Sequence, residues 1–231
     1  MEAPAPRPLL VEVDDHGAVS ALLCLPERAR ACYVLAHGAG AGMHHAFMQA
    51  VAAGLDRRRV ATLRYQFPSM ERGSRRPDSP HVAHATVRAA VAAAAATTGG
   101  LPLFAGGKSF GGRMTSQAQA TAPLPGVAGL IFLGFPLHPA GRPADERAAH
   151  LAQVACPMLF LQGTRDELAE TGRVRAVVDR LGPRATLRLF DDADHSFHVR
   201  ARSGRTDAGV LDEMLDELAG WIDTITGQPR A

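Results

Sequence analysis

Cysteine, lysine and long apolar runs are all scarce in this sequence of 231 residues. The three cysteines, Cys24, Cys32 and Cys156, are odd in number and lack metal-ligand spacing, which argues against a disulfide framework and favours a reducing compartment. No apolar run is long enough to span a bilayer, and the N-terminus lacks the basic and apolar regions of a secretory signal. The sequence therefore predicts a cytoplasmic protein without a membrane partner.

A strong excess of one charge is also lacking. The formal net charge is +2, and nearly all of the positive charge is arginine, because Lys108 is the only lysine. Proteins that bind nucleic acid or anionic membranes usually carry a larger basic excess, so neither is expected as a partner. A small molecule is the expected partner.

Short apolar runs alternate with helical patterns along the chain. The runs at residues 9–14 and 18–25 flank Asp15-His16-Gly17, which suits the turn of an antiparallel hairpin. Further strands are predicted at residues 31–37, 60–67, 101–107, 126–135, 157–163 and 185–190. Helices are predicted at residues 44–55, 82–96, 110–120, 171–181 and 210–225.

This order of elements predicts a single α/β domain over residues 1–231, since 46% hydrophobic composition supplies one substantial core. We expect a mostly parallel sheet with an N-terminal antiparallel hairpin and helices on both faces. Residues 68–80 are rich in proline, serine and arginine and are predicted to form a loop.

Residues 105–112, AGGKSFGG, fit two motifs that lead to different enzymes. A phosphate-binding loop requires a glycine five positions before Gly107, where Pro102 stands. A nucleophile elbow, G-x-S-x-G, requires a strand, a sharp turn and a helix, and the flanking sequence supplies all three. Small residues are needed at Gly107 and Gly111 because side chains would clash across so tight a turn. We therefore predict Ser109 as a nucleophile at the apex of the turn.

A serine nucleophile requires a base within hydrogen-bonding distance and an acid that orients the base. Asp166 follows the predicted strand 157–163, and His195 follows the strand 185–190. Parallel strands end at one edge of the sheet, and the chain order Ser, acid, His is the one expected for an elbow of this kind. Ser109, Asp166 and His195 are therefore the predicted catalytic residues.

Other readings of these acids and histidines stay open. Asp166 could instead cap a helix, and competing acids lie close to His195 in sequence. The competing acids are Asp191, Asp192 and Asp194. His198 is a second candidate base, and its spacing from His195 could suit a metal, but no third ligand stands at a sensible spacing. We expect no metal.

Two backbone amides are candidate donors to an oxyanion. One is the amide of Phe110, directly after the nucleophile. The other lies in the glycine-rich residues 37–42, where we favour Ala39 and then Gly40. The same stretch partly fits a dinucleotide-binding fingerprint, but Met43 stands where the third glycine belongs. We expect no cofactor.

Six stretches together resemble the α/β-hydrolase superfamily. They are LAHGAGAGMHH, FPSMERGSRRPD, GGKSFGGRM, GFPLHP, PMLFLQGTRDELA and DADHSFH. They are most similar to a branch of small lidless hydrolases that includes testis-expressed hydrolase-like proteins, a subunit of the non-specific-lethal complex and bacterial relatives akin to dienelactone hydrolases. The resemblance implies an α/β-hydrolase fold without a substantial lid, with Ser109 as nucleophile, Asp166 as acid and His195 as base.

The expected function is hydrolysis of an ester or thioester of a small substrate through an acyl-enzyme on Ser109. The alternative from another class is a binding or scaffolding module that keeps the fold with little turnover, and a peptidase or amidase is a rival among enzymes. His37, Lys108, Arg75 and Arg76 are candidate substrate-binding residues. For Lys108 the alternative is a structural role, and for the two arginines it is a solvated loop.

Overall fold

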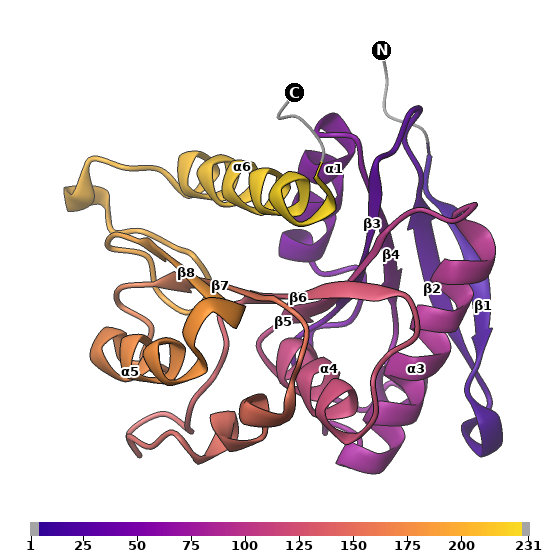
Figure 1. Cartoon of the computed structure of the whole chain (residues 1–231), viewed down its shortest axis with the longest axis horizontal. Helices are drawn as coiled ribbons and strands as arrows, with labels where there is room; N and C mark the ends of the chain where they lie inside the picture. The colour runs from indigo at the N-terminus through magenta and orange to yellow at the C-terminus, as the bar shows by residue number, and fades with distance from the viewer. Residues whose placement is uncertain (1–4, 228–231) are drawn as a thin grey trace.

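The computed structural model describes residues 5–227, in which eight strands form one sheet (Figure 1). The strands are β1 (Arg7–Glu12), β2 (Ala18–Cys24), β3 (Ala31–Ala36), β4 (Val60–Tyr65), β5 (Leu103–Lys108), β6 (Val127–Leu133), β7 (Met158–Gly163) and β8 (Ala185–Phe190). They lie in the order β1-β2-β4-β3-β5-β6-β7-β8. The pairings β1–β2 and β2–β4 are antiparallel and the others are parallel. The predicted mostly parallel sheet with an N-terminal antiparallel hairpin is confirmed.

Helices cover both faces of this sheet, as predicted. They are α1 (Ala46–Arg57), α2 (Pro68–Glu71), α3 (Pro80–Thr97), α4 (Phe110–Thr121), α5 (Thr171–Leu181) and α6 (Asp207–Thr226), with 3₁₀ turns η1 (Asp14–His16), η2 (Glu146–Gln153), η3 (Gly182–Arg184) and η4 (Ala201–Ser203). Figure 1 shows α1 and α6 on one face and α3, α4 and α5 on the other. Among residues 5–227, no helix is both long and apolar enough to cross a membrane.

The core is divided by the sheet into two clusters, and β3 contributes to both. Ala31, Tyr33 and Leu35 pack with side chains of α1 and α6. Cys32, Val34 and Ala36 pack with side chains of α3 and α4. All six are buried because successive side chains of a strand point to opposite faces and helices cover each face. This explains why the strand reads as one continuous apolar run.

The prediction of a loop at residues 68–80 is partly wrong. Residues 68–71 form the helical turn α2, with Pro68 at its first position, where the fixed φ of proline suits a helix. The Ser69 amide donates to Asp78 at 2.8 Å, so the following segment folds back onto this turn. Helix α3 also begins two residues earlier than predicted, because Ser79 caps it and Pro80 occupies its first position.

The bounds of several other elements differ from the prediction by one to three residues; α1, for example, is Ala46–Arg57 and α6 is Asp207–Thr226. The first strand ends at Glu12, and Asp14, predicted within it, belongs to η1. The connection between β6 and β7 contains η2, which the sequence analysis did not predict. No long insertion accompanies it, so residues 5–227 contain no substantial lid, as predicted.

The strand order places the loops after β3 and β5 beside each other. Strand β3 lies between β4 and β5. From β3 the chain continues to β4 on one side, and from β5 it continues to β6 on the opposite side. In open α/β sheets, ligands bind where such a reversal opens a crevice at the carboxyl ends of the strands. The loops after β7 and β8 end at the same edge. This edge is therefore where the predicted site residues can meet.

Helix α4 approaches the end of β3 too closely for a side chain at the contact. A Cβ atom on Gly111 would lie 2.6 Å from the His37 carbonyl oxygen and 2.7 Å from the Ala36 oxygen. Gly220, in the middle of α6, has no atom within 4 Å of the same position. A side chain therefore has space at Gly220 and none at Gly111.

We expect Gly111→Ala and Gly220→Ala to change stability in opposite directions. Alanine in the open helix position should stabilise by roughly 0.5–1 kcal/mol, because glycine loses more backbone entropy on folding. Alanine at Gly111 must displace backbone and should destabilise by roughly 1–3 kcal/mol. Urea unfolding of both variants tests this expectation, and a stabilised Gly111→Ala protein would contradict the close contact.

Candidate active site

Ser109 lies at the apex of a strained turn between β5 and α4. Its backbone has φ 50° and ψ −112°, a conformation that non-glycine residues rarely adopt. The glycine two residues earlier allows this turn, because a Cβ on Gly107 would lie 2.1 Å from the Ala36 carbonyl oxygen. The sequence therefore forms the strand, sharp turn and helix that the G-x-S-x-G pattern predicts.

Hydrogen bonds join Ser109, His195 and Asp166 in one chain. His195 Nε2 lies 2.8 Å from Ser109 Oγ, and His195 Nδ1 lies 2.6 Å from Asp166 Oδ2. A carboxylate can only accept, so Nδ1 carries the proton and Nε2 accepts from the serine hydroxyl; this tautomer is assigned from the partners. The arrangement can move the serine proton to the imidazole.

Asp166 is buried and its oxygens are fully engaged. Besides His195, it accepts from the Leu168 amide at 2.8 Å and from the Gln162 side chain. Such donors compensate a carboxylate for lost water. These contacts suit an acid that orients a base. A residue that only capped a helix would not need the contact with His195.

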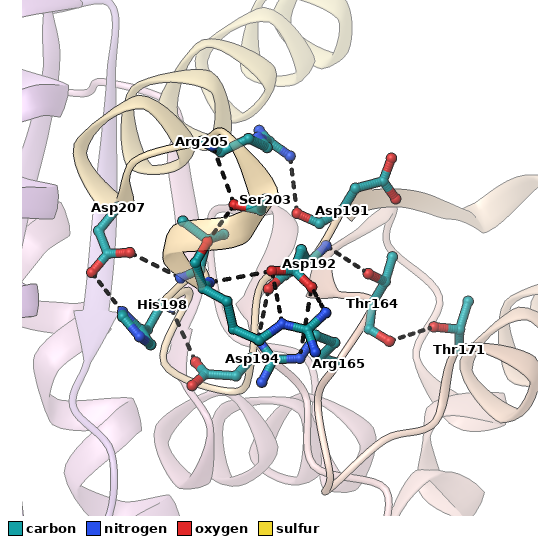
Figure 2. Close-up of polar contacts among 12 residues, drawn as sticks. Thr164, Arg165, Thr171, Asp191, Asp192, Asp194, His198, Ser203, Arg205 and Asp207 are labelled. Atoms are coloured by element: carbon teal, nitrogen blue, oxygen red, sulfur yellow. Dashed lines mark hydrogen bonds and ion pairs between the residues drawn. The ribbon is translucent and has the colours of Figure 1, made fainter.

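Two of the three competing acids and the competing base have other partners, as Figure 2 shows. Asp194 accepts from the amides of Ser196 and His198, and so stabilises the loop that carries His195. Asp192 forms an ion pair with Arg200. The His198 ring lies 2.9 Å from Asp207, which raises the pKa of His198, and the ring is largely exposed.

The carboxyl group of Asp191 forms no hydrogen bond with the described residues; only the backbone oxygen of Asp191 accepts one, from the Arg205 side chain (Figure 2). In the part of the chain that the structure describes, no three His, Cys, Asp or Glu side chains are grouped to hold a metal ion.

The amides of Phe110 and Ala39 are free to bind an oxyanion. Neither donates a hydrogen bond to any residue in the range 5–227. Phe110 begins α4, whose first amides have no partner within the helix and carry its positive end. Ala39 lines both cavities that reach Ser109, whereas Gly40 lines neither and faces the backbone of Arg75.

His37 does not face the cavities around Ser109. Its side chain is buried, its Nε2 accepts from the Phe67 amide at 3.1 Å, and its Nδ1 donates to the Gly38 oxygen at 2.7 Å. Burial lowers the pKa of His37, and both ring nitrogens are hydrogen-bonded. The ring ties the loop after β3 to the end of β4 and has no atom left for a substrate.

Lys108, directly before Ser109, contacts the loop that carries His195. Its Nζ donates to the backbone oxygen of His195 and lies 5.6 Å from the centre of the Phe197 ring. Loss of water lowers the pKa of Lys108 to about 8, although Asp166 and Asp194 act in the opposite direction. The candidate arginines of the 68–80 segment, Arg75 and Arg76, are exposed and line neither cavity.

Two cavities meet at Ser109 and share Ala39 and Leu168. The Phe110-side cavity, about 370 Å³, is lined in addition by Phe110, Arg113, Arg147, Asp78, Pro77, Pro80 and Pro136. The His195-side cavity, about 330 Å³, is lined in addition by His195, Ser196, Lys108, Gly38, Ala41, His45, Phe47 and Met48. Sequence reasoning missed Arg113 and Arg147. The signal for Arg113 was its position one helical turn after Ser109.

We expect the stability of the wild type, relative to Lys108→Met, to rise as the pH increases from about 8 to 10.5. In this interval the unfolded lysine keeps a proton that the folded lysine has lost, so raising the pH favours the folded state. Urea unfolding of both proteins at about pH 7 and about pH 10 measures the difference, in which the cysteines and tyrosines cancel. Parallel pH profiles would contradict a desolvated Lys108.

Solved structures of α/β hydrolases resemble this fold over nearly its full length. An alpha-beta serine hydrolase homologue from Coxiella burnetii has a TM-score of 0.75 at 20% identity, covering 96% of this chain and 100% of that chain. A dienelactone hydrolase from Anabaena variabilis has a TM-score of 0.75 at 18% identity, covering 96% and 99%. A serine hydrolase without a lid from Xanthomonas campestris has a TM-score of 0.68 at 21% identity, covering 98% and 96%.

The family comparison covers most of the sequence. The model of the family described as "Alpha/beta hydrolase domain" matches residues 29–223, which include the strands β3 to β8 and the loops that carry Ser109, Asp166 and His195. With the sheet order and the strained turn at Ser109, this match identifies the chain as a member of the α/β-hydrolase domain family.

Proposed function

We propose that the protein is a serine hydrolase that cleaves a carboxylic ester or thioester of a small substrate through an acyl-enzyme on Ser109. The observation that carries this proposal is the continuous hydrogen-bonded chain from Ser109 through His195 to the buried Asp166. The family membership supports a hydrolase. Among the similar structures, one is named a dienelactone hydrolase and another an esterase domain, which favours ester chemistry.

In the acylation step, His195 Nε2 removes the proton of the Ser109 hydroxyl as its oxygen attacks the substrate carbonyl carbon. The carbonyl π electrons move to the oxygen, and the amides of Phe110 and Ala39 stabilise this oxyanion. Asp166 keeps the imidazolium oriented through Nδ1. When the oxyanion collapses, the bond to the leaving oxygen or sulfur breaks, and His195 returns the proton to the leaving group.

In the deacylation step, the same groups act on water. His195 Nε2 accepts a proton from a water molecule that attacks the acyl carbon, and the two amides again stabilise the oxyanion. Collapse breaks the bond to Ser109 Oγ, which takes back the proton from His195. The carboxylic acid leaves and the enzyme is restored without any external oxidant or cofactor.

The geometry favours turnover over a binding or scaffolding role. Both contacts of the chain lie within hydrogen-bonding distance, at 2.8 and 2.6 Å, and two cavities give access to Ser109. A module that had lost catalysis would have no need for a strained serine backbone or for a buried carboxylate aimed at a histidine.

The free thiols Cys24, Cys32 and Cys156 fit a reducing compartment, which we propose is the cytoplasm.

We expect a fluorophosphonate probe to label the wild type stoichiometrically at Ser109 and not to label Ser109→Ala. The matched control is Ser116→Ala, because Ser116 Oγ also contacts a histidine, His150, at 2.8 Å but belongs to no chain that ends in a carboxylate. Intact mass measures the labelling. If folded wild type stays unlabelled, or if Ser116→Ala loses the label while Ser109→Ala keeps it, the proposed nucleophile is wrong.

We expect Asp166→Asn to lower kcat for a short-chain ester by about 10⁴-fold, because the amide would favour the wrong tautomer of His195. The fold should survive, since asparagine keeps the size of the side chain. Steady-state kinetics with circular dichroism of the same sample measures both. A loss smaller than about tenfold would argue against Asp166 as the orienting acid.

A further inference from the structure

The position of His195 assigns the two cavities to the two halves of an ester. His195 must return its proton to the leaving group, and it lines only the His195-side cavity. The leaving group therefore occupies that cavity. The Phe110-side cavity lies beyond the candidate oxyanion amide of Phe110 and is not lined by His195. It is where the acyl chain extends from the carbonyl carbon.

The wall of the Phe110-side cavity holds two arginines without partners. Neither the Arg113 nor the Arg147 guanidinium forms a hydrogen bond or an ion pair with any described residue. Arg113 Nε is shielded from solvent and still lacks an acceptor. The guanidinium carbon of Arg113 lies 6.0 Å from the centre of the Phe110 ring, which helps to fix its position.

Several other arginines of this protein are paired with carboxylates. Arg30 forms an ion pair with Asp223, Arg58 with Asp212 and Asp216, and Arg200 with Asp192. Each has its own carboxylate. Arg64 Nε is likewise shielded without an acceptor among residues 5–227, but the Arg64 guanidinium binds the Met43 oxygen and lines neither cavity at Ser109. The Arg113 guanidinium has no partner among the described residues and lines the cavity, which leaves its terminal nitrogens for a ligand.

The remaining charged groups near this cavity do not neutralise the two arginines. The one carboxylate in its lining, Asp78, already accepts from the Ser69 amide and from Arg72. The neighbouring His150 and His84 both have lowered pKa values, caused first by burial and then by nearby positive groups that include Arg113. The described lining of this cavity thus holds two cations and no carboxylate that lacks a partner.

We propose that the Phe110-side cavity binds an acyl chain that ends in a carboxylate, with Arg113 and Arg147 as its binding groups. The substrates would be monoesters or monothioesters of dicarboxylic acids. This proposal rests on the proposed hydrolase function, because it uses Ser109 as the point from which the acyl chain extends. A carboxylate offers the two coplanar oxygens that the terminal nitrogens of a guanidinium bind.

The test compares the 4-methylumbelliferyl monoester of adipic acid with 4-methylumbelliferyl hexanoate. The two acyl chains have the same number of carbons and differ only in a terminal carboxylate or methyl group. We expect the wild type to prefer the adipate ester by about 10- to 100-fold in kcat/KM, mainly through a lower KM. Equal rates for the two esters, or a preference for hexanoate, would overturn the subsite while leaving the hydrolase function intact.

The arginine variants assign the preference to residues. We expect Arg113→Gln and Arg147→Gln each to reduce the ratio of the two kcat/KM values, and Arg113→Lys to retain part of it, because lysine keeps the charge without the fork. The matched control is Arg175→Gln on the exposed face of α5, which should leave the ratio unchanged. A ratio unaffected by Arg113→Gln and Arg147→Gln would overturn the assignment.

A binding measurement separates failure of the subsite from failure of the hydrolase function. Calorimetry with Ser109→Ala protein and adipate needs no turnover. Adipate binding that is lost in Ser109→Ala/Arg113→Gln supports the subsite even if no ester is hydrolysed and no fluorophosphonate label appears. If Ser109→Ala protein does not bind adipate, the subsite is wrong, whether or not the wild type is labelled.

Discussion

The contact between the end of β3 and the start of α4 is the constraint on which the candidate site depends. Gly107 and Gly111 let this turn lie directly against the backbone of Ala36 and His37, at distances that exclude any side chain. The contact fixes the strained backbone of Ser109 and also brings the loop after β3 beside it. One packing requirement therefore positions the proposed nucleophile and both proposed oxyanion donors together.

Three hydrogen-bonding groups hold the proposed base and its loop. Asp166 orients the His195 ring through a buried charge-assisted hydrogen bond. Lys108 binds the backbone oxygen of the same residue, and Asp194 accepts amides further along the loop, in the network of Figure 2. Since side chain and backbone are both restrained, the ring needs little reorganisation before it accepts the serine proton.

Much of the fold could be predicted from the sequence because its signals are local. The period of the apolar residues located every strand and the longer helices, and the G-x-S-x-G pattern fixed the turn at Ser109. Asp166 and His195 were found because parallel strands end at one edge, and the structure joins them to Ser109 by hydrogen bonds. Their catalytic roles stay a prediction.

What the sequence did not reveal depends on contacts between distant segments. The ring of His37 was a candidate for substrate binding until its partner, the amide of Phe67 at the end of another strand, could be located. Arg147 lies in the 3₁₀ segment η2, which the sequence analysis did not predict, and only the folded chain brings it to the cavity beside Arg113. Whether a polar side chain is bonded within the protein or lines a cavity thus depends on its tertiary neighbours, which local patterns do not encode.

The absence of a substantial lid gives the charged cavity wall a particular importance for selectivity. An enzyme that closes over its substrate can exclude water and strengthen every polar contact. Here the Phe110-side cavity is bordered by three prolines, Pro77, Pro80 and Pro136, whose fixed φ angles favour a preformed entrance over a moving one. Selection must then come from groups already in position. Two arginines that line the cavity and have no partner in the part of the chain that the structure describes meet this requirement.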